Sequence, residues 1–193
     1  MTKEGTVLID AFYSDPHFGH GKISQLAGRG FHDVEDMNEG LIERYNDLVG
    51  PSDLCLWLGD CFFLPAHEAE TIMDRLNGYK LLIRGNHDRS AAWMTGIGFE
   101  LVAEELRMKI AGRRVRLSHY PYEGTKTHTR PKEIPGLPHP KKVKGEVLVH
   151  GHTHSPAKVS GNMVHAGCDA WDLSPVPYED LAQLIGELPG GDS

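Results

Sequence analysis

Three short apolar runs alternate with two amphipathic segments, and this alternation limits the fold of the first half of the chain more than any other feature. The runs are compact and rich in large apolar residues, as buried strands are, and they cover residues 6–13, 54–59 and 79–84. Between them, residues 33–50 and 65–78 repeat apolar side chains at helical spacing and end at a glycine. A strand–helix–strand–helix–strand order predicts a parallel sheet with right-handed crossovers.

The second half of the chain has a different pattern. Strands are predicted over residues 99–119, joined by a tight turn at Ala111 to Arg113, and over residues 145–150. Gly161 and Asn162 lie between two short apolar segments, which indicates a hairpin, and residues 177–188 are predicted to form a last helix. We therefore expect an α/β fold with mixed sheets, a two-sheet sandwich flanked by helices, in one domain over residues 1–188. Residues 189–193 are expected to form a flexible tail.

Composition narrows the class of protein. With 39% hydrophobic and 24% charged residues among 193, the chain resembles an ordinary globular protein, and no apolar window approaches the ~20 residues that span a bilayer. Three cysteines at no metal-like spacing suit a reducing cytoplasm, so a cytoplasmic location is expected. The net charge of −7 argues against strong binding of nucleic-acid polymers. The lysine-rich stretch 120–145 either attracts a small anionic substrate or is a solvated face.

Five predicted strands each end in a polar motif. The motifs are "SDPHFGH", "GDCFF", "GNHD", "SHYPY" and "HGHTH", and they begin at residues 14, 59, 85, 118 and 150. Because ligands bind outside the carboxyl ends of parallel strands, these motifs are predicted to converge on one site. They supply oxygen and nitrogen donors without a thiolate, a set that suits Mn, Fe or Zn: Asp15, His17, Asp60, Asn86, His119, His152 and His154. Seven ligands exceed the needs of one ion and fit two, which a carboxylate can bridge.

Each motif taken alone also has a structural interpretation. An Asp-x-His at a strand end is commonly a turn or a helix cap, and "GNHD" could be an Asx-type turn. His119 alone could be a hydrogen-bonded structural histidine. The occurrence of all five motifs at strand ends favours one dinuclear metal site.

The ordered set "DPH", "GD", "GNHD", the histidine of "SHYP" and "GHTH" resembles the signature of the calcineurin-like metallophosphoesterase superfamily, in particular its small bacterial and phage members. The resemblance extends from Asp15 to His154 and implies a four-layer β-sandwich flanked by helices. It implies one metal ion at Asp15, His17, Asp60 and His154, with Asp60 bridging to a second ion at Asn86, His119 and His152. It also implies that His87 is an acid near the leaving group and that Asp88 orients His87. The expected ion is Mn, with Fe, Zn, Ni or Co as other candidates.

The expected function is dinuclear-metal-dependent hydrolysis of phosphate esters. A metal-activated hydroxide would attack phosphorus while His87 donates a proton to the departing oxygen. Small phosphodiesters such as 2',3'-cyclic nucleotides are the favoured substrates. A phosphomonoesterase, a non-catalytic metal-binding scaffold and a nuclease acting on polymers are the alternatives. His20, Arg84 and Arg89 are candidate substrate contacts. The alternative for His20 is a structural hydrogen bond, and the alternative for the two arginines is an ordinary solvated side chain. Trp171 would either stack on a base or belong to the core.

Overall fold

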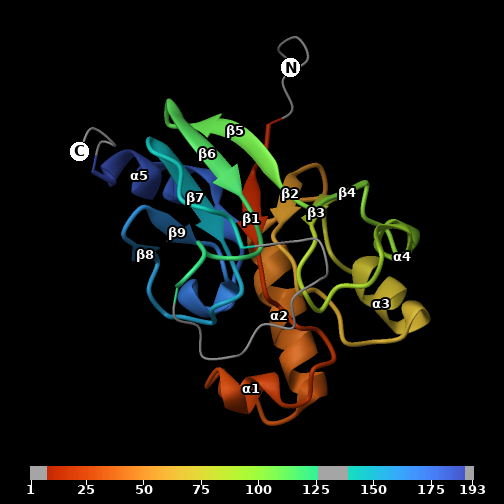
Figure 1. Ribbon diagram of the computed structural model, residues 1–193. Coiled ribbons are helices and arrows are strands. Elements are labelled where there is room, and N and C mark those ends of the chain that lie inside the picture. The colour runs from red at the N-terminus through yellow and green to blue at the C-terminus, as the bar shows by residue number, and fades with distance from the viewer. Residues whose placement is uncertain (1–7, 126–138, 190–193) are drawn as a thin grey trace.

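A computed structural model describes residues 8–125 and 139–189, which form two mixed five-stranded sheets (Figure 1). The first sheet has the strand order β10-β1-β2-β3-β4. Its four parallel strands are β1 (Ala11–Tyr13), β2 (Leu54–Trp57), β3 (Tyr79–Ile83) and β4 (Leu101–Ala103). The two-residue strand β10 (Val176–Pro177) pairs with β1 in the antiparallel direction, so the first sheet is parallel except at one edge.

The second sheet has the strand order β5-β6-β7-β9-β8. It contains β5 (Leu106–Ile110), β6 (Arg113–Leu117), β7 (Glu146–His150), β8 (Val159–Ser160) and β9 (Met163–His165). The central strands β6, β7 and β9 are parallel, whereas β5 and β8 pair antiparallel at the two edges. The tight turn and the hairpin expected from the sequence are the β5–β6 and β8–β9 connections.

Helices cover the outer face of the first sheet. They are α1 (Ile23–Leu26), α2 (Val34–Leu48), α3 (Ala66–Met73) and α4 (Ala91–Gly96), and a single 3₁₀ turn (Cys168–Ala170) follows β9. The longest, α2, begins where the Asp33 side chain accepts a hydrogen bond from the Asp36 N–H at 2.8 Å. Its apolar stripe, with Met37, Leu41 and Tyr45 fully buried, packs in one cluster with Tyr13 and Trp57 of the sheet.

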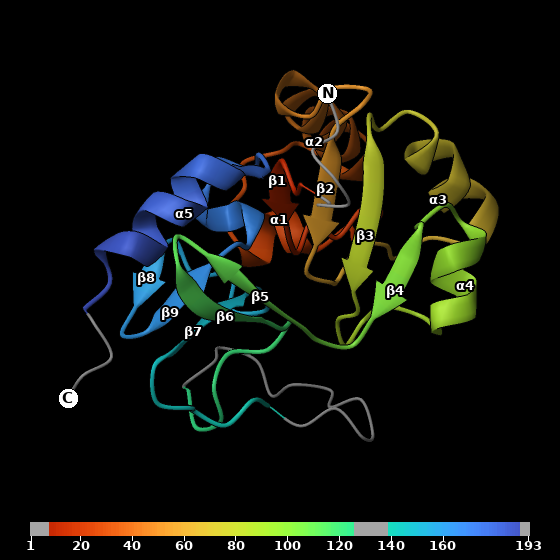
Figure 2. The same cartoon turned by 90° about the horizontal axis from the view of Figure 1, so that it is seen from above.

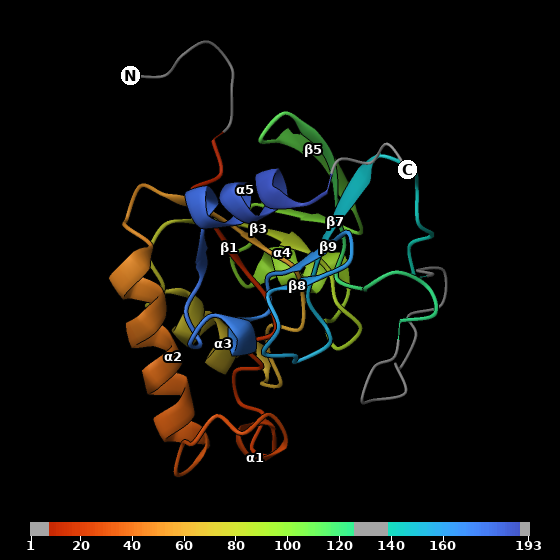
Figure 3. The same cartoon turned by 90° about the vertical axis from the view of Figure 1, so that its left-hand side faces the viewer.

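A second apolar cluster lies between the two sheets. Phe12, Leu56 and Ile83 enter it from the first sheet, and Val147 and Val149 enter it from β7 of the second. The helix α5 (Tyr178–Glu187) adds buried leucine and isoleucine side chains to the same cluster. Figures 2 and 3 show the resulting order, with α2 and α3 outside the first sheet and the strands β6, β7 and β9 on its other side.

The sequence-based expectation of an α/β fold with two mixed sheets is confirmed. The first strand is shorter than expected and begins at Ala11, and the short elements α4 and β10 were not predicted. The predicted tail and the middle of the 120–145 stretch fall largely outside the described residues. None of the helices in residues 8–125 and 139–189 combines the length and apolarity that a membrane crossing requires.

Candidate metal centre

The five polar motifs meet at the carboxyl ends of strands from both sheets. Two groups of ligand atoms form there, each with its atoms within 4.8 Å of one another: Asp15, His17 and His154 in the first, and Asp60, His119 and His152 in the second. The seventh predicted ligand, Asn86, places its Oδ1 3.0 Å from Nε2 of His119. All seven side chains predicted from the sequence are therefore brought together.

Asp60, a member of the second group, also lies next to the first group. Its Oδ2 is 3.6 Å from Nε2 of His17 in the first group and 3.5 Å from Nε2 of His119 in the second. The Asp60 side chain is almost completely buried, with 2% of its surface exposed. A carboxylate in this position can contact two ions at once, one on each side.

Acceptor atoms crowd around Nε2 of His119. Its Nδ1 lies 2.7 Å from the carbonyl oxygen of Leu58, which can only accept, so Nδ1 carries the hydrogen and Nε2 of the neutral ring has a lone pair. This Nε2 faces the Asn86 oxygen, Nδ1 of His152 at 3.2 Å and the Asp60 oxygen. A single proton can join only two of these four atoms at a time, whereas a cation would satisfy all four.

Several buried nitrogens at the centre have no hydrogen-bond partner among the described residues. They are both ring nitrogens of His17 and Nε2 of His152. Leaving a buried polar group unpaired costs about 1–3 kcal/mol, and native proteins rarely tolerate it without a functional reason. A metal ion accepts the lone pair of a neutral imidazole, so these orphaned atoms and the nitrogen–oxygen ligand set fit divalent ions.

The pKa values of the buried ligands depend on burial and on one another. Burial, with the nearby carboxylates of Asp15 and Asp88, raises the pKa of Asp60 to about 7 against the opposing effect of His119. Burial alone would lower the pKa of His119, but the Asp60 and Asp15 carboxylates raise it. Burial and the adjacent His119 lower the pKa of His152 to about 3. Near neutral pH, the metal-free centre thus retains a proton at the Asp60–His119 pair, while His152 is a neutral ligand.

The backbone at the centre is held in a conformation that non-glycine residues seldom adopt. Five of the seven predicted ligands have a positive φ, between 49° and 69°: Asp15, His17, Asp60, His152 and His154. This left-handed conformation is costly for side chains with a Cβ, and such residues concentrate at functional sites. Gly59 has no room for a Cβ, because the Gly85 backbone and the His119 ring lie directly against it.

A buried ion pair contacts the first ligand group, and the sequence pattern does not predict it. Nδ1 of His154 donates to Oδ2 of Asp169 at 2.7 Å, and the Asp169 carboxylate also receives Nε of Arg29 at 2.8 Å. The same guanidinium, 1% exposed, donates to the backbone oxygen of Asp15 at 2.7 Å. Hydrogen bonds of this kind fix the tautomer of a ligating histidine and turn its other nitrogen toward the ion. Arg29 and Asp169 are 140 positions apart, so no local motif reveals the pair.

Asp88 has a different role from the one expected. We expected its carboxylate to orient the His87 ring, but its hydrogen bonds in the structure run to the backbone N–H groups of Gly85, Asp60 and Cys61, at 2.7, 2.9 and 2.8 Å. The His87 N–H in turn donates to Oδ1 of Asp60 at 2.9 Å. Asp88 therefore links the loop after β2 to the loop after β3, and it positions His87 through the backbone.

His87 and His20 lie at the exposed side of the centre. Nε2 of His87 is 4.0 Å from Oδ2 of Asp60, and 39% of the His87 side chain is exposed. Partial burial and the neighbouring histidines His119 and His20 lower the pKa of His87. His20 stays near the centre, with its ring 5.7 Å from that of His17, while its Nδ1 accepts from the Lys22 N–H.

The two arginines expected near the substrate contact other residues. Arg84 forms an ion pair with Glu104, with 2.6 Å between the closest nitrogen and oxygen atoms. The guanidinium of Arg89 lies over the Trp93 ring, 5.1 Å from its centroid. His139, which was not among the predicted site residues, lies close to the metal centre. Its ring stacks on Tyr120, and its centroid is 6.1 Å from that of His152.

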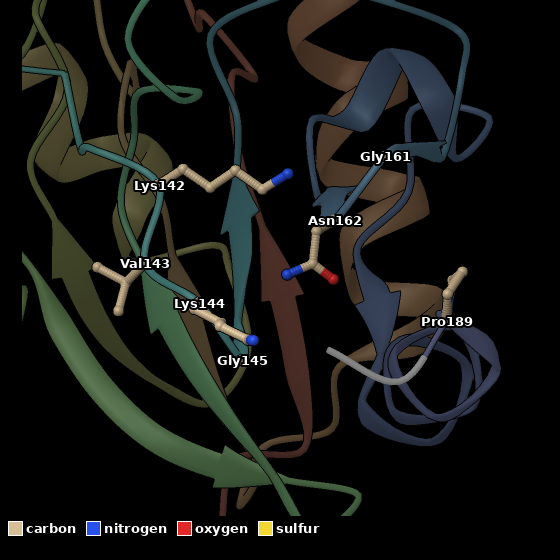
Figure 4. Close-up of a pocket in the computed structure, with 7 residues that line it drawn as sticks. All are labelled: Lys142, Val143, Lys144, Gly145, Gly161, Asn162 and Pro189. Carbon is tan, nitrogen blue, oxygen red and sulfur yellow. The ribbon is translucent and has the colours of Figure 1, made fainter. Parts of the chain in front are cut away.

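A separate pocket of about 530 Å³ lies at the amino end of β7 (Figure 4). The metal centre, in contrast, lies at the carboxyl ends of the strands. Two lysines of the lysine-rich stretch border it, and its lining residues are Lys142, Val143, Lys144, Gly145, Gly161, Asn162 and Pro189. The charge of these two lysines is therefore not directed at the ligand groups.

Comparison with known proteins identifies relatives along almost the whole chain, although no family model matches it. The gene 66 protein of Mycobacterium phage L5 is 32% identical over 208 aligned positions, which cover 92% of this chain and 94% of the relative. The gene 66 protein of Mycobacterium phage D29 is 30% identical and covers 93% and 97% of the two chains. The uncharacterized protein MJ1445 of Methanocaldococcus jannaschii is 40% identical over 78 positions, or 39% of this chain and 44% of that protein.

The fold also occurs among solved structures. The crystal structure of AQ665, a protein of unknown function from Aquifex aeolicus, superposes with a TM-score of 0.65 over 91% of this chain and 98% of that one. At 23% identity this likeness concerns the fold alone. The phage relatives, in contrast, match in sequence over nearly their full length, and the chain belongs to the family of mycobacteriophage gene 66 proteins.

Proposed function

We propose that this chain is a dinuclear-metal-dependent phosphoesterase of the metallophosphoesterase type, with the four-layer sandwich of that superfamily, and that it hydrolyses small phosphodiesters such as 2',3'-cyclic nucleotides. The observation that carries the proposal is the position of Asp60, whose Oδ2 lies 3.6 Å and 3.5 Å from one histidine of each ligand group. Two-metal hydrolytic sites need a bridging ligand between ions about 3.5–4 Å apart.

The ligand set favours a particular range of ions. Asp15, His17 and His154 would hold one ion, and Asn86, His119 and His152 the other, with Asp60 shared between them. Imidazole and oxygen ligands suit Mn, with Fe, Zn, Ni or Co as further candidates. When bound, two such ions supply a hydroxide near neutral pH and neutralise phosphate oxygens.

The protein's own residues would do the remaining work. The bond between phosphorus and the leaving oxygen breaks as the nucleophile attacks from the opposite side, and the departing oxygen must gain a proton. His87 is the partly exposed ring beside Asp60 and would donate that proton from its imidazolium form. Asp88 keeps the His87 loop in place through its three backbone hydrogen bonds. The three buried free cysteines are consistent with a cytoplasmic enzyme.

The test is a matched assay of metal-restored protein. After removal of metal with a chelator and addition of Mn, bis-p-nitrophenyl phosphate should be hydrolysed faster than p-nitrophenyl phosphate. Faster hydrolysis of the monoester would make the protein a phosphomonoesterase instead. Two bound ions without turnover of either ester, or of a 2',3'-cyclic nucleotide, would contradict the proposal and favour a non-catalytic scaffold.

An isosteric variant identifies the bridging ligand. Asp60→Asn should abolish turnover and reduce the bound metal below two ions per chain, measured by elemental analysis. The control is Asp47→Asn on the exposed side of α2, which changes the same functional group away from the centre and should leave both values unchanged.

A further inference from the structure

We propose that Phe63 is a binding surface for the nucleobase, or another aromatic leaving group, of the phosphodiester substrate. This inference rests on the proposed phosphodiesterase function and narrows its substrate class from small phosphodiesters to aromatic ones.

Phe63 lies three residues after the bridging Asp60, at the exposed side of the metal centre. Its ring centroid is 5.1 Å from that of the predicted ligand His17, 4.3 Å from that of His20 and 4.9 Å from that of His87. It retains 37% of its surface exposed, similar to the 39% of the His87 side chain. Phe63 and His87 are thus two accessible rings next to each other above a buried centre.

The backbone of Phe63 is held in position. Its N–H donates to the carbonyl oxygen of Phe18 at 2.8 Å, and Phe18 and Phe62 form a parallel bridge with their rings stacked 5.5 Å apart. Phe62 is 5% exposed and belongs to the core, whereas its neighbour Phe63 is turned outward. A fixed backbone reduces the entropy lost when a ligand binds against the ring.

The position of His87 determines which part of a substrate would reach Phe63. His87 is the proposed donor to the leaving oxygen, so the group attached to that oxygen lies beside the His87 ring and within reach of the Phe63 ring. In a nucleoside 2',3'-cyclic phosphate the leaving oxygen belongs to the ribose, which carries the base. Every nucleobase has a π-face, so stacking on an aromatic side chain binds bases without strong preference among them.

Trp171, the other aromatic candidate for stacking on a base, already contacts other groups of the protein. Lys158 places its ammonium 3.8 Å from the centroid of the Trp171 ring, and the indole N–H donates to the backbone oxygen of His165. Trp171 also packs against the cluster between the sheets. Trp171 therefore has a structural role, whereas the exposed Phe63 ring lies beside the His17, His20 and His87 rings.

The decisive experiment compares two cyclic phosphodiesters that differ in the base. Adenosine 2',3'-cyclic phosphate and glycerol 1,2-cyclic phosphate share the five-membered cyclic ester, and only the first carries an aromatic group. Phe63→Leu should raise KM for the adenosine substrate about tenfold, the size of one lost stacking contact, and leave the glycerol substrate unchanged. Phe63→Trp should restore or lower KM for the adenosine substrate.

Calorimetric binding of the product provides a readout that does not depend on turnover. Adenosine 3'-monophosphate should bind the Mn-loaded protein more tightly than glycerol 1-phosphate does, and Phe63→Leu should remove this difference. Tyr79→Leu is the matched control, because Tyr79 is 56% exposed at the start of β3, the end of the strand away from the centre. It should change neither binding nor kinetics.

The outcomes separate this inference from the proposed function. Loss of nucleotide preference in Phe63→Leu supports the nucleobase surface even if no diester is hydrolysed. Equal losses on both cyclic esters would show that Phe63 only supports the His17 and His20 rings, and would overturn the inference while the phosphodiesterase proposal stands. No change on either ester would overturn it as well.

Discussion

At the scale of single residues, the raised pKa of Asp60 predicts how metal binding would depend on pH. The raised pKa of Asp60, about 7, means that the metal-free carboxyl group gains a proton as the pH falls through neutrality. Metal binding must displace that proton. We therefore expect Mn binding to release about one more proton at pH 6 than at pH 8, measured by calorimetry in buffers of different ionisation enthalpy. Release that does not vary with pH would contradict the raised pKa.

The role of His87 can be separated from metal binding by the choice of leaving group. A nitrophenolate departs without a proton, whereas an alkoxide needs one. His87→Ala should slow hydrolysis of an alkyl diester about 10²- to 10⁴-fold and change a nitrophenyl diester little. The lowered pKa makes the imidazolium a minor form of His87 between pH 8 and pH 6.5, and its fraction rises as the pH falls. The alkyl-to-nitrophenyl rate ratio should therefore rise over that range in the wild type only. Equal losses on both esters would exclude His87 as the acid.

The Arg29–Asp169 pair is expected to act on the metal through His154. Asp169→Asn keeps the shape of the side chain but weakens its hydrogen bond to the imidazole and its ion pair with Arg29. Metal affinity should fall about 10- to 100-fold, the usual effect of removing such a partner. Competition with a chromogenic chelator measures it. Glu104→Gln, which weakens the exposed Arg84 ion pair, is the control and should keep the wild-type affinity.

At the scale of elements, the loops after β2 and β3 form one unit because a single carboxylate joins them. Asp88→Ala would leave the backbone N–H groups of Gly85, Asp60 and Cys61 without their acceptor. Loss of these charge-assisted hydrogen bonds should lower the free energy of unfolding by roughly 2–4 kcal/mol and reduce metal content. Urea denaturation measures the first effect. A variant with normal stability would contradict the role assigned to Asp88.

Which elements the sequence predicts depends on how local their cause is. Strands β2 and β3 and helices α2 and α3 follow from apolar patterns within the segment itself, and they were predicted, although α3 ends at Met73, before the expected Gly78. β10 has two residues and exists only because Val176 meets Phe12 across the sheet, which no local pattern encodes. The six-residue α4 is likewise too short for its periodicity to stand out.

The same distinction applies to the candidate site. All seven proposed ligands lie within four residues after a strand end, so the order of motifs was enough to predict that they converge. Arg29 and Asp169 come from distant parts of the chain, and only the fold brings them together. Phe63 was visible in "GDCFF", but its exposure distinguishes it from Phe62, and exposure is not readable from two adjacent phenylalanines.

At the scale of the whole molecule, the metal centre should control how stability varies with pH. In the metal-free protein, the raised pKa values of Asp60 and His119 keep a proton at this pair, and metal binding requires its loss. The proton is held more fully at pH 6.5 than at pH 8, so Mn competes with it more strongly at the lower pH. The rise in Tm on addition of Mn should therefore be larger at pH 8 than at pH 6.5. A rise that is equal or larger at pH 6.5 would contradict this account.

The proposed ligands are divided between the two sheets, and therefore between the two halves of the chain. Asp15, His17, Asp60 and Asn86 follow strands of the first sheet, whereas His119, His152 and His154 follow strands of the second. Each ligand group takes members from both sheets, so neither residues 8–105 nor residues 106–189 contain a complete group. Metal affinity would thus be a property of the assembled halves, and each ion would join the two halves of the polypeptide much as a covalent cross-link does.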